Sequence, residues 1–279
     1  MTLTRKTQPG LVLTAVVLFV LLFLAPKTHS SKKLEDSKLP MNKESQANVE
    51  AFLTIATKSL NNDLKTEYDG LVKNANASSI DTSFMSVVQF WDKQKRPDFA
   101  SYYFEKIADK KQNFETYLKA GDRYYYSIKF IKDNAEIEAL YQSAIRCYNK
   151  ALEKNSKNSE AKIQLAACFV EDGKDPMKGI SLLREVEKID SNNVKLQLTF
   201  AFFSVKSGQL DKAIKRFNKV LEIDPLFIEA YLHLADAYEQ QGDTNKTIEM
   251  LSKYASLTND EMAKQEVKKY IEQLKKVNN

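Results

Sequence analysis

Few residues of this 279-residue chain could carry covalent or metal chemistry. It contains two histidines, His29 and His233, and two cysteines, Cys147 and Cys168. Metal sites and nucleophilic catalytic sets need such residues in clusters, with zinc ligands typically about two to five positions apart. The cysteines are 168 − 147 = 21 positions apart, with no histidine near either. The pattern predicts a protein that is not an enzyme and has no catalytic residues, metal or cofactor.

The same residues fit simpler structural roles. His233 is expected to be a surface residue of a helix, and the two cysteines are expected to be buried thiols. A disulfide between Cys147 and Cys168 stays open, because it requires Cα atoms within about 7 Å. The sequence contains no glycine-rich phosphate loop. We therefore expect no small-molecule substrate.

The composition favours a helical, globular chain. Apolar residues make up 43% and charged residues 28%, whereas glycine and proline number only 7 and 6. Residues 1–30 contain three basic residues and no acidic one, which leaves 42 − 3 = 39 basic against 37 acidic residues elsewhere. A nucleic-acid-binding face needs clustered positive charge, so we expect no nucleic-acid partner.

The first functional signal is the uncharged stretch Leu11–Ala25. As a helix its 15 residues would span about 22 Å, against about 30 Å for the hydrocarbon core of a bilayer. Arg5 and Lys6 precede the stretch and favour a cytoplasmic N-terminus, although lysines also follow it. We expect residues 1–26 to be a single-pass membrane anchor. The rest of the chain would then lie on the far, periplasmic or extracytoplasmic side.

Two alternatives stay open for this stretch. A cleaved signal peptide would leave a secreted or periplasmic protein, and Thr28–Ser30 offers a weak cleavage site. A buried core helix is the third interpretation, although the stretch has no polar face. Residues 27–43 are polar and broken by Pro40, which predicts a flexible tether, and residues 44–80 are predicted to form two helices outside any repeat.

Beyond residue 80 the chain repeats itself. Gly208 and Gly242 are 34 positions apart, and Phe217 matches Leu251 at the same distance. The pattern extends backwards through Gly173 with one residue inserted. A period of 34 made from two amphipathic helices joined at a glycine turn predicts stacked helical hairpins.

These units resemble the tetratricopeptide repeat family. The clearest match to its pattern of large, small and aromatic positions is at Tyr231, Leu234, Ala235, Tyr238, Ile248 and Leu251. The resemblance implies an all-α, right-handed superhelical solenoid of stacked hairpins. The implied repeats are about 81–113, 114–158, 159–193, 194–227 and 228–261, followed by a capping helix over 262–279.

Eight positions are expected to pack the hairpins together. Small residues occur where two helices approach closely, and large residues fill the gaps between successive hairpins. The expected packing residues are Ala144, Tyr148, Gly179, Leu183, Ala213, Phe217, Ala235 and Tyr238. Each hairpin would thus bury part of its neighbour.

The resemblance also implies a concave groove lined by the first helix of each hairpin. Its predicted lining residues are Leu118, Tyr125, Ile163, Val170, Leu198, Phe202, Val205 and Leu232. Family members that clamp the carboxylates of a peptide carry Lys, Arg and Asn on this stripe, and those residue types are absent here. We expect the partner to be another protein or peptide segment with an apolar face.

Other interpretations of this stripe stay open. Apolar residues at helical spacing are often core residues. The groove could also be filled by residues 44–73 or by an eleven-residue expansion that follows Tyr124.

The combination of anchor, tether and repeats resembles bacterial inner-membrane proteins that hold a repeat domain in the periplasm beside translocation or folding machinery. We therefore expect a membrane-tethered scaffold for protein–protein interaction, with the membrane contacted through residues 11–25. The alternative is an obligate structural or assembly subunit, an ancillary factor of periplasmic translocation or folding, whose groove is permanently occupied.

Overall fold

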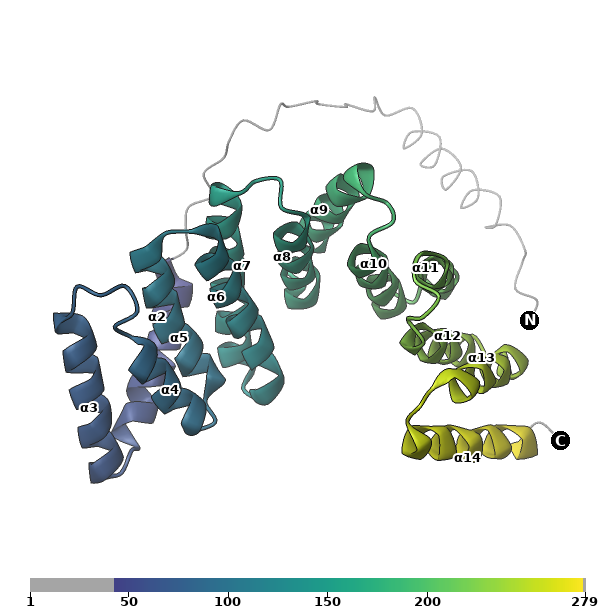
Figure 1. The fold of residues 1–279 in the computed structure, drawn as a ribbon, viewed down its shortest axis with the longest axis horizontal. Coiled ribbons are helices and arrows are strands. Elements are labelled where there is room, and N and C mark those ends of the chain that lie inside the picture. Colours follow the sequence, from purple (N-terminus) through teal and green to yellow (C-terminus); the bar gives the residue numbers. More distant parts are fainter. Residues whose placement is uncertain (1–42, 278–279) are drawn as a thin grey trace, which may run out of the picture. The chain divides into compact units, whose positions relative to one another are not determined.

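The structure is a computed structural model that describes residues 43–277. These residues form 13 α-helices and one short 3₁₀ helix and contain no strand. From α4 (Met85–Lys93) onward each helix packs against the next one in the sequence, as Figure 1 shows. The predicted all-α solenoid of stacked helical hairpins is confirmed. The predicted anchor and residues 27–42 of the predicted tether lie outside the described residues.

Ten of the helices pair into hairpins, and we call the two members of each pair its first and second helix. The pairs are α4 with α5 (Pro97–Lys111), α6 (Phe114–Ser127) with α7 (Asn134–Lys154), α8 (Ser159–Asp172) with α9 (Pro176–Ile189), α10 (Val194–Lys206) with α11 (Leu210–Ile223), and α12 (Glu229–Gln240) with α13 (Thr244–Leu257). None of the helices within residues 43–277 is long and apolar enough to cross a membrane.

Three of the hairpins turn at a glycine in a left-handed backbone conformation. Gly173, Gly208 and Gly242 have φ angles of 76°, 70° and 78°. Only glycine adopts this conformation without steric cost, so the spacing of the glycines sets the spacing of the turns. The same backbone hydrogen bond recurs in two of these turns. The N–H groups of Gln209 and Asp243 donate to carbonyls five residues earlier, at 2.8 and 2.9 Å.

Asparagine side chains cap the first helices of three hairpins. The side-chain oxygens of Asn113, Asn158 and Asn193 accept from the backbone N–H groups three residues later, at 2.9, 2.8 and 3.0 Å. Each cap satisfies a helical N–H group that has no partner within its helix. The caps therefore fix where α6, α8 and α10 begin.

The expansion after Tyr124 lengthens one hairpin. It continues α6 to Ser127, adds the 3₁₀ helix η1 (Ile128–Phe130), and leads into the 21 residues of α7. The main packing partners of η1 are α6 and α7, its own hairpin. The expansion therefore packs partly on α6, the helix that carries the predicted groove residues Leu118 and Tyr125.

Two helices precede the hairpins. α2 (Lys43–Lys58) packs chiefly on the second helices α7 and α5, and α3 (Asn62–Ala77) packs on α4. The predicted groove residues lie on α6, α8, α10 and α12, which are not the main partners of either helix. Residues 44–73 thus cover a different part of the array.

The array ends with α14 (Glu261–Val277), which packs on α13. Ile271 is 6% exposed, and Val267 and Leu274 pack beside it against the last hairpin. Most exposed positions of this helix are lysine, glutamate or glutamine, and Met262 and Tyr270 are exposed as well. α14 is therefore the predicted capping helix, with one apolar face on the array and one solvated face.

One cluster of charges is buried among α5, α6 and α7. Glu105, which is 1% exposed, accepts from Arg146 Nε at 2.9 Å and Nη2 at 2.7 Å and from the Tyr124 hydroxyl at 2.9 Å. Burial by itself raises the pKa of Glu105, but the hydrogen bonds and positive charge of Arg146, with a smaller effect of Lys150, outweigh burial and hold this pKa below its ordinary value.

Candidate functional site

The predicted groove residues of α6 and α8 lie mostly within the packed array. Ile163 and Val170 are 1% and 9% exposed and belong to a core cluster between α8, α9 and α10. Leu118 and Tyr125 are half-buried against the core of the preceding hairpins. Ile163 and Val170 are therefore packing residues, which corrects the expectation that they face a partner.

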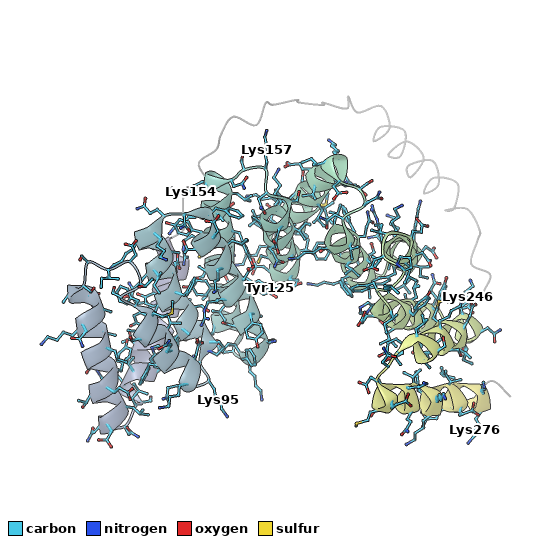
Figure 2. The ribbon with its side chains drawn as sticks, viewed as in Figure 1. Lys95, Tyr125, Lys154, Lys157, Lys246 and Lys276 are labelled. Atoms are coloured by element: carbon cyan, nitrogen blue, oxygen red, sulfur yellow. The ribbon has the colours of Figure 1, made fainter. Side chains whose placement is uncertain are left out.

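Tyr125, labelled in Figure 2, has a structural partner of its own. Its hydroxyl donates to Glu171 Oε1 at 2.7 Å, and the Tyr141 hydroxyl donates to Glu171 Oε2 at 3.1 Å. Three helices, α6, α7 and α8, are joined by these two bonds. Burial and the neighbouring carboxylate of Glu171 raise the pKa of both phenols, so both stay protonated and donating at neutral pH.

The first helix α10 is apolar over most of its circumference, and Lys195, Thr199 and Lys206 lie on its polar side. Its positions Leu196, Phe200, Ala201 and Phe203 are buried in the array. On the remaining face, Leu198 and Val205 are half-buried, and Phe202 is 44% exposed. A surface helix normally presents polar residues to water, and a helix that is apolar all round is normally buried. On α10, Phe202 is the large apolar side chain that is left exposed, beside the polar side of the helix.

Phe202 contacts aromatic rings from the two following helices. Its ring meets Phe217 edge-on at 5.5 Å and His233 edge-on at 4.9 Å between centroids, and Phe217 stacks on His233 at 5.2 Å. Burial lowers the pKa of His233 despite the opposing charges of Asp236 and Glu229. The imidazole is therefore neutral at pH 7 and behaves as part of an apolar surface.

We call Leu198, Phe202, Val205 and His233 the Phe202 surface. The first three were predicted as groove residues, and the structure places them together on α10. His233 was predicted only as a surface helix residue, because its contacts with α10 and α11 depend on how neighbouring hairpins are oriented. Leu232, the remaining predicted groove residue, is half-buried against the last hairpin and α14.

The predicted packing residues lie at contacts between helices. Seven of them are buried, and the eighth, Tyr238, is half-buried beside the cluster around Phe217. Tyr148 is fully buried, and its hydroxyl donates to Asp122 Oδ1 at 2.8 Å. At Gly179 the helices approach so closely that an added Cβ would lie 2.6 Å from the backbone oxygen of Ala166.

The cysteines and the described histidine, which could have carried covalent or metal chemistry, form no metal-binding cluster among the described residues. Cys147 and Cys168 are both buried and free, and burial raises the pKa of each thiol well above its ordinary value. Within the part of the chain that the structure describes, no three metal-ligating side chains come together. His29 lies outside the described residues.

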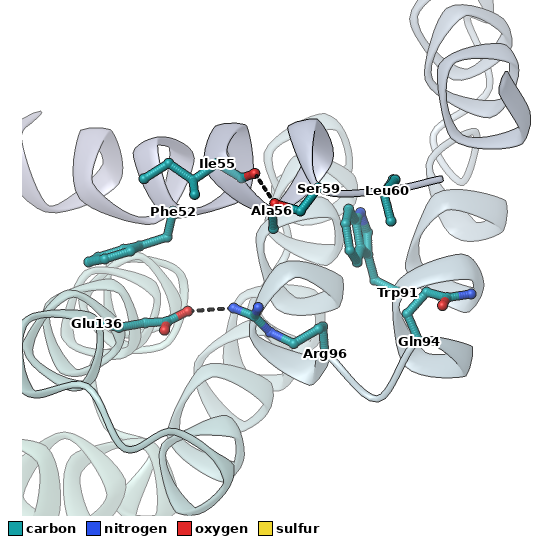
Figure 3. Close-up of a pocket in the computed structure, with 9 residues that line it drawn as sticks. All are labelled: Phe52, Ile55, Ala56, Ser59, Leu60, Trp91, Gln94, Arg96 and Glu136. Carbon is teal, nitrogen blue, oxygen red and sulfur yellow. Dashed lines mark hydrogen bonds and ion pairs between the residues drawn. The ribbon is translucent and has the colours of Figure 1, made fainter. Parts of the chain in front are cut away.

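A cavity of about 490 Å³ lies where α2 meets the hairpins (Figure 3). It is lined by apolar side chains that include Phe52, Ile55 and Trp91 and by the ion pair of Arg96 with Glu136, whose Nη2–Oε1 distance is 2.6 Å. The buried indole N–H of Trp91 has no hydrogen-bond partner among the described residues. Sequence reasoning did not find this cavity, because α2 belongs to no repeat.

The comparison with family models identifies repeats in the C-terminal part of the chain. One model, described as "TPR repeat", matches residues 205–242, and a second, described as "Tetratricopeptide repeat", matches residues 229–257. The chain matches no curated protein.

Solved structures with similar folds include a tetratricopeptide repeat protein from Parabacteroides merdae ATCC 43184. It is 14% identical with a TM-score of 0.55, over 83% of this chain and 87% of that one. At this identity the likeness shows the fold alone. Two others are MamA from Desulfovibrio magneticus RS-1 (17% identity, TM-score 0.48, 63% of this chain and 94% of that one) and YrrB, titled a TPR protein with an unusual peptide-binding site (19%, 0.43, 72% and 97%). The family-model matches support the tetratricopeptide repeat family for residues 205–257.

Proposed function

We propose that the protein is a non-catalytic scaffold that binds another protein through the Phe202 surface and is tethered to a membrane through residues 11–25. The observation that carries the proposal is the open face of α10, where an apolar helix leaves Phe202 44% exposed. Burying an aromatic side chain of this kind is a main source of binding energy at protein interfaces. A partner that covered this face would bury Phe202.

The chemistry beside the Phe202 surface favours an apolar partner segment with a neutral or basic flank. Asp236 is exposed on the neighbouring first helix, α12, and its charge acts on His233, as does that of Glu229. These carboxylates would repel an acidic chain terminus, which agrees with the absence of a carboxylate clamp in the predicted stripe. Apolar side chains at helical or alternate spacing would fit the surface formed by Leu198, Phe202 and Val205.

The hairpins bury their core residues within the chain itself, which favours a transient adaptor over an obligate subunit. Leu183, Ala213 and Leu234 are fully buried within the chain itself. The hairpins therefore have complete cores without a partner, whereas an obligate subunit usually depends on its partner for stability. We expect the protein to be purified alone as a folded chain.

Copurification from native membranes tests the binding function. Phe202→Ser should remove a partner that copurifies with the wild type, while Lys157→Ser, an exchange in the exposed loop after α7, should retain it. Thermal unfolding of both variants must stay close to the wild type for the comparison to hold. Equal partner recovery from both variants would overturn the role of Phe202.

Extraction of membranes at alkaline pH tests the tether separately. The full chain should stay with the membrane, because an apolar helical segment of this kind partitions into lipid. A variant without residues 1–26 should appear in the soluble fraction. Release of the full chain would contradict a retained anchor without affecting the test at Phe202.

A further inference from the structure

A second groove, different in character, lies between the successive second helices α9 and α11. Its floor is α10, which contributes Gln197, Phe200 and Ser204, and its volume is about 780 Å³. We call it the basic groove, because its walls carry the cations Arg184, Lys212, Lys215, Arg216 and Lys219. The acidic residues that line it are only Glu187 and Glu222, so the lining has a net charge of 5 − 2 = +3.

Part of this charge is neutralised within the groove. Arg216 forms an ion pair with Glu187, donates to Gln197 Oε1 at 2.8 Å, and lies 4.4 Å from the centre of the Phe200 ring. These contacts hold Arg216 in place across the floor. Lys219 forms an exposed pair with Glu222 at 3.1 Å, on the same helix.

Three cations remain for a partner. Arg184 on α9 and Lys212 and Lys215 on α11 form no ion pair with any carboxylate among the described side chains, residues 49–276. Lys212 donates to a neutral group, the side-chain oxygen of Gln209, at 2.5 Å. The uncompensated positive charge thus comes from both walls of the groove.

The groove also offers apolar surface between these charges. Met177 is 67% exposed at the beginning of α9, Ile180 is half-buried one turn later, and Phe200 forms the apolar part of the floor. A site for a small inorganic anion would not need such surface. The combination instead suits a chain that alternates acidic and apolar side chains.

We propose that the basic groove binds an acidic peptide segment of another protein, with at least one apolar side chain that contacts Met177 and Ile180. The wall from Met177 to Glu187 is about 15 Å long, at about 1.5 Å per helical residue. An extended chain covers this length with about five residues, at about 3.3 Å each. The groove therefore takes a short linear segment.

Shape favours a peptide over an anionic membrane. The cations flank a hollow whose floor is a third helix, and a planar bilayer would reach only the rim of such a groove. A peptide chain can enter it and place carboxylates beside both walls. The basic groove is also separate from the Phe202 surface, because Phe200 and Phe202 point to different faces of α10.

Selection from a random library of ten-residue peptides displayed on phage tests the proposal. The target is the full chain in nanodiscs of phosphatidylcholine, and the variant Lys212→Glu/Lys215→Glu in the same nanodiscs serves for counter-selection. We expect the surviving peptides to be rich in Asp and Glu and to contain an apolar residue. Their affinity should fall at least tenfold in the double variant and should weaken between 50 and 500 mM salt.

Two matched variants make the result specific. Lys154→Glu/Lys157→Glu, which reverses two exposed lysines at the end of α7 and in the following loop, should change the affinity less than twofold. Phe202→Ser should also leave the peptide affinity unchanged, because Phe202 lies outside the basic groove. The peptide experiment can therefore fail while the copurification test of Phe202 succeeds, and the reverse. Survivors without acidic residues, or equal binding to the double variant, would overturn the proposal.

Lysine acetylation of the wild type gives a second measurement that does not depend on a folded variant. The best selected peptide should slow acetylation of Lys212 and Lys215 relative to Lys154 and Lys157. Nanodiscs that contain phosphatidylserine, with no peptide added, should not slow it. Protection by phosphatidylserine alone would assign the groove to the membrane surface and overturn the peptide proposal.

Discussion

At the residue scale, the array depends on positions where a side chain would have no room. Gly179 on α9 faces the backbone of α8, where a Cβ would lie 2.6 Å from Ala166 O and 2.8 Å from Val170 Cγ2. Backbone atoms cannot move aside as a flexible side chain can. The glycine is therefore a packing residue and has no role in a turn.

Gly179→Ala should lower the free energy of unfolding by roughly 1–3 kcal/mol, because the new methyl group overpacks this crossing. The matched control is Gly70→Ala in α3, where nothing lies within 4 Å of the added Cβ. That exchange should stabilise the chain by about 0.5–1 kcal/mol through helix propensity. Chemical denaturation measures both, and a neutral Gly179→Ala would contradict the close crossing.

The buried ion pair of Glu105 with Arg146 makes a second prediction at this scale. Glu105→Gln removes the buried carboxylate that accepts two hydrogen bonds from Arg146, which should cost roughly 3–5 kcal/mol in unfolding free energy. Glu272→Gln, which removes an exposed pair with Lys275, should have no measurable effect. Similar losses in the two variants would show that the pair at Glu105 contributes little.

Glu136 at the α2 cavity predicts a pH dependence. Burial and a hydrogen bond shared with Asp98 raise the pKa of Glu136 to about 7, against the opposing charge of Arg96. Because the folded state binds this proton more tightly than the unfolded state does, the contribution of Glu136 to stability is present at low pH and is lost as the pH rises from about 4.5 to about 7. Unfolding at a series of pH values should show this difference between the wild type and Glu136→Gln. A constant difference would contradict the raised pKa.

At the element scale, the end of the array depends on one helix. α14 docks through Ile271, which packs in a cluster with Ala235 and Leu251 of the last hairpin. Without this helix, the apolar side of α13 would face water. The docking of α14 therefore protects the last hairpin.

Ile271→Asp should undock α14, because an aspartate at a position that is 6% exposed would carry an unpaired charge into the apolar cluster. Hydrogen exchange in α13 and α14 should accelerate. Lys268→Asp, an exchange on the exposed face of the same helix, should leave exchange nearly unchanged. If the two variants exchange alike, α14 is not held by its apolar face.

The elements that sequence could predict are those that obey the repeat. The spacing of Gly173, Gly208 and Gly242 gave the turns, because positive φ angles require glycine there. Periodicity alone could not tell whether Ile163 faces a groove or a neighbouring hairpin, since both surfaces are apolar. The packing of α2 on α5 and α7 could not be predicted either, because that helix matches no repeat and its contacts are distant in sequence.

In the whole molecule, the membrane segment, the Phe202 surface and the basic groove would each have a separate function. Residues 11–25 would hold the protein at a membrane, and the hairpins would present the Phe202 surface and the basic groove. The two surfaces have opposite chemistry, since one is apolar and the other carries uncompensated cations. Two different segments could therefore bind at the same time, from one partner or from two.

Photocrosslinking in the native cell would show whether the Phe202 surface contacts another protein. A photoreactive amino acid replaces Phe202 in one variant and Lys157 in a second, and adducts are identified by mass spectrometry. We predict a discrete adduct with another protein from position 202 that is absent from position 157. Adducts from position 202 solely within this chain, or the same proteins captured from both positions, would contradict the proposed contact.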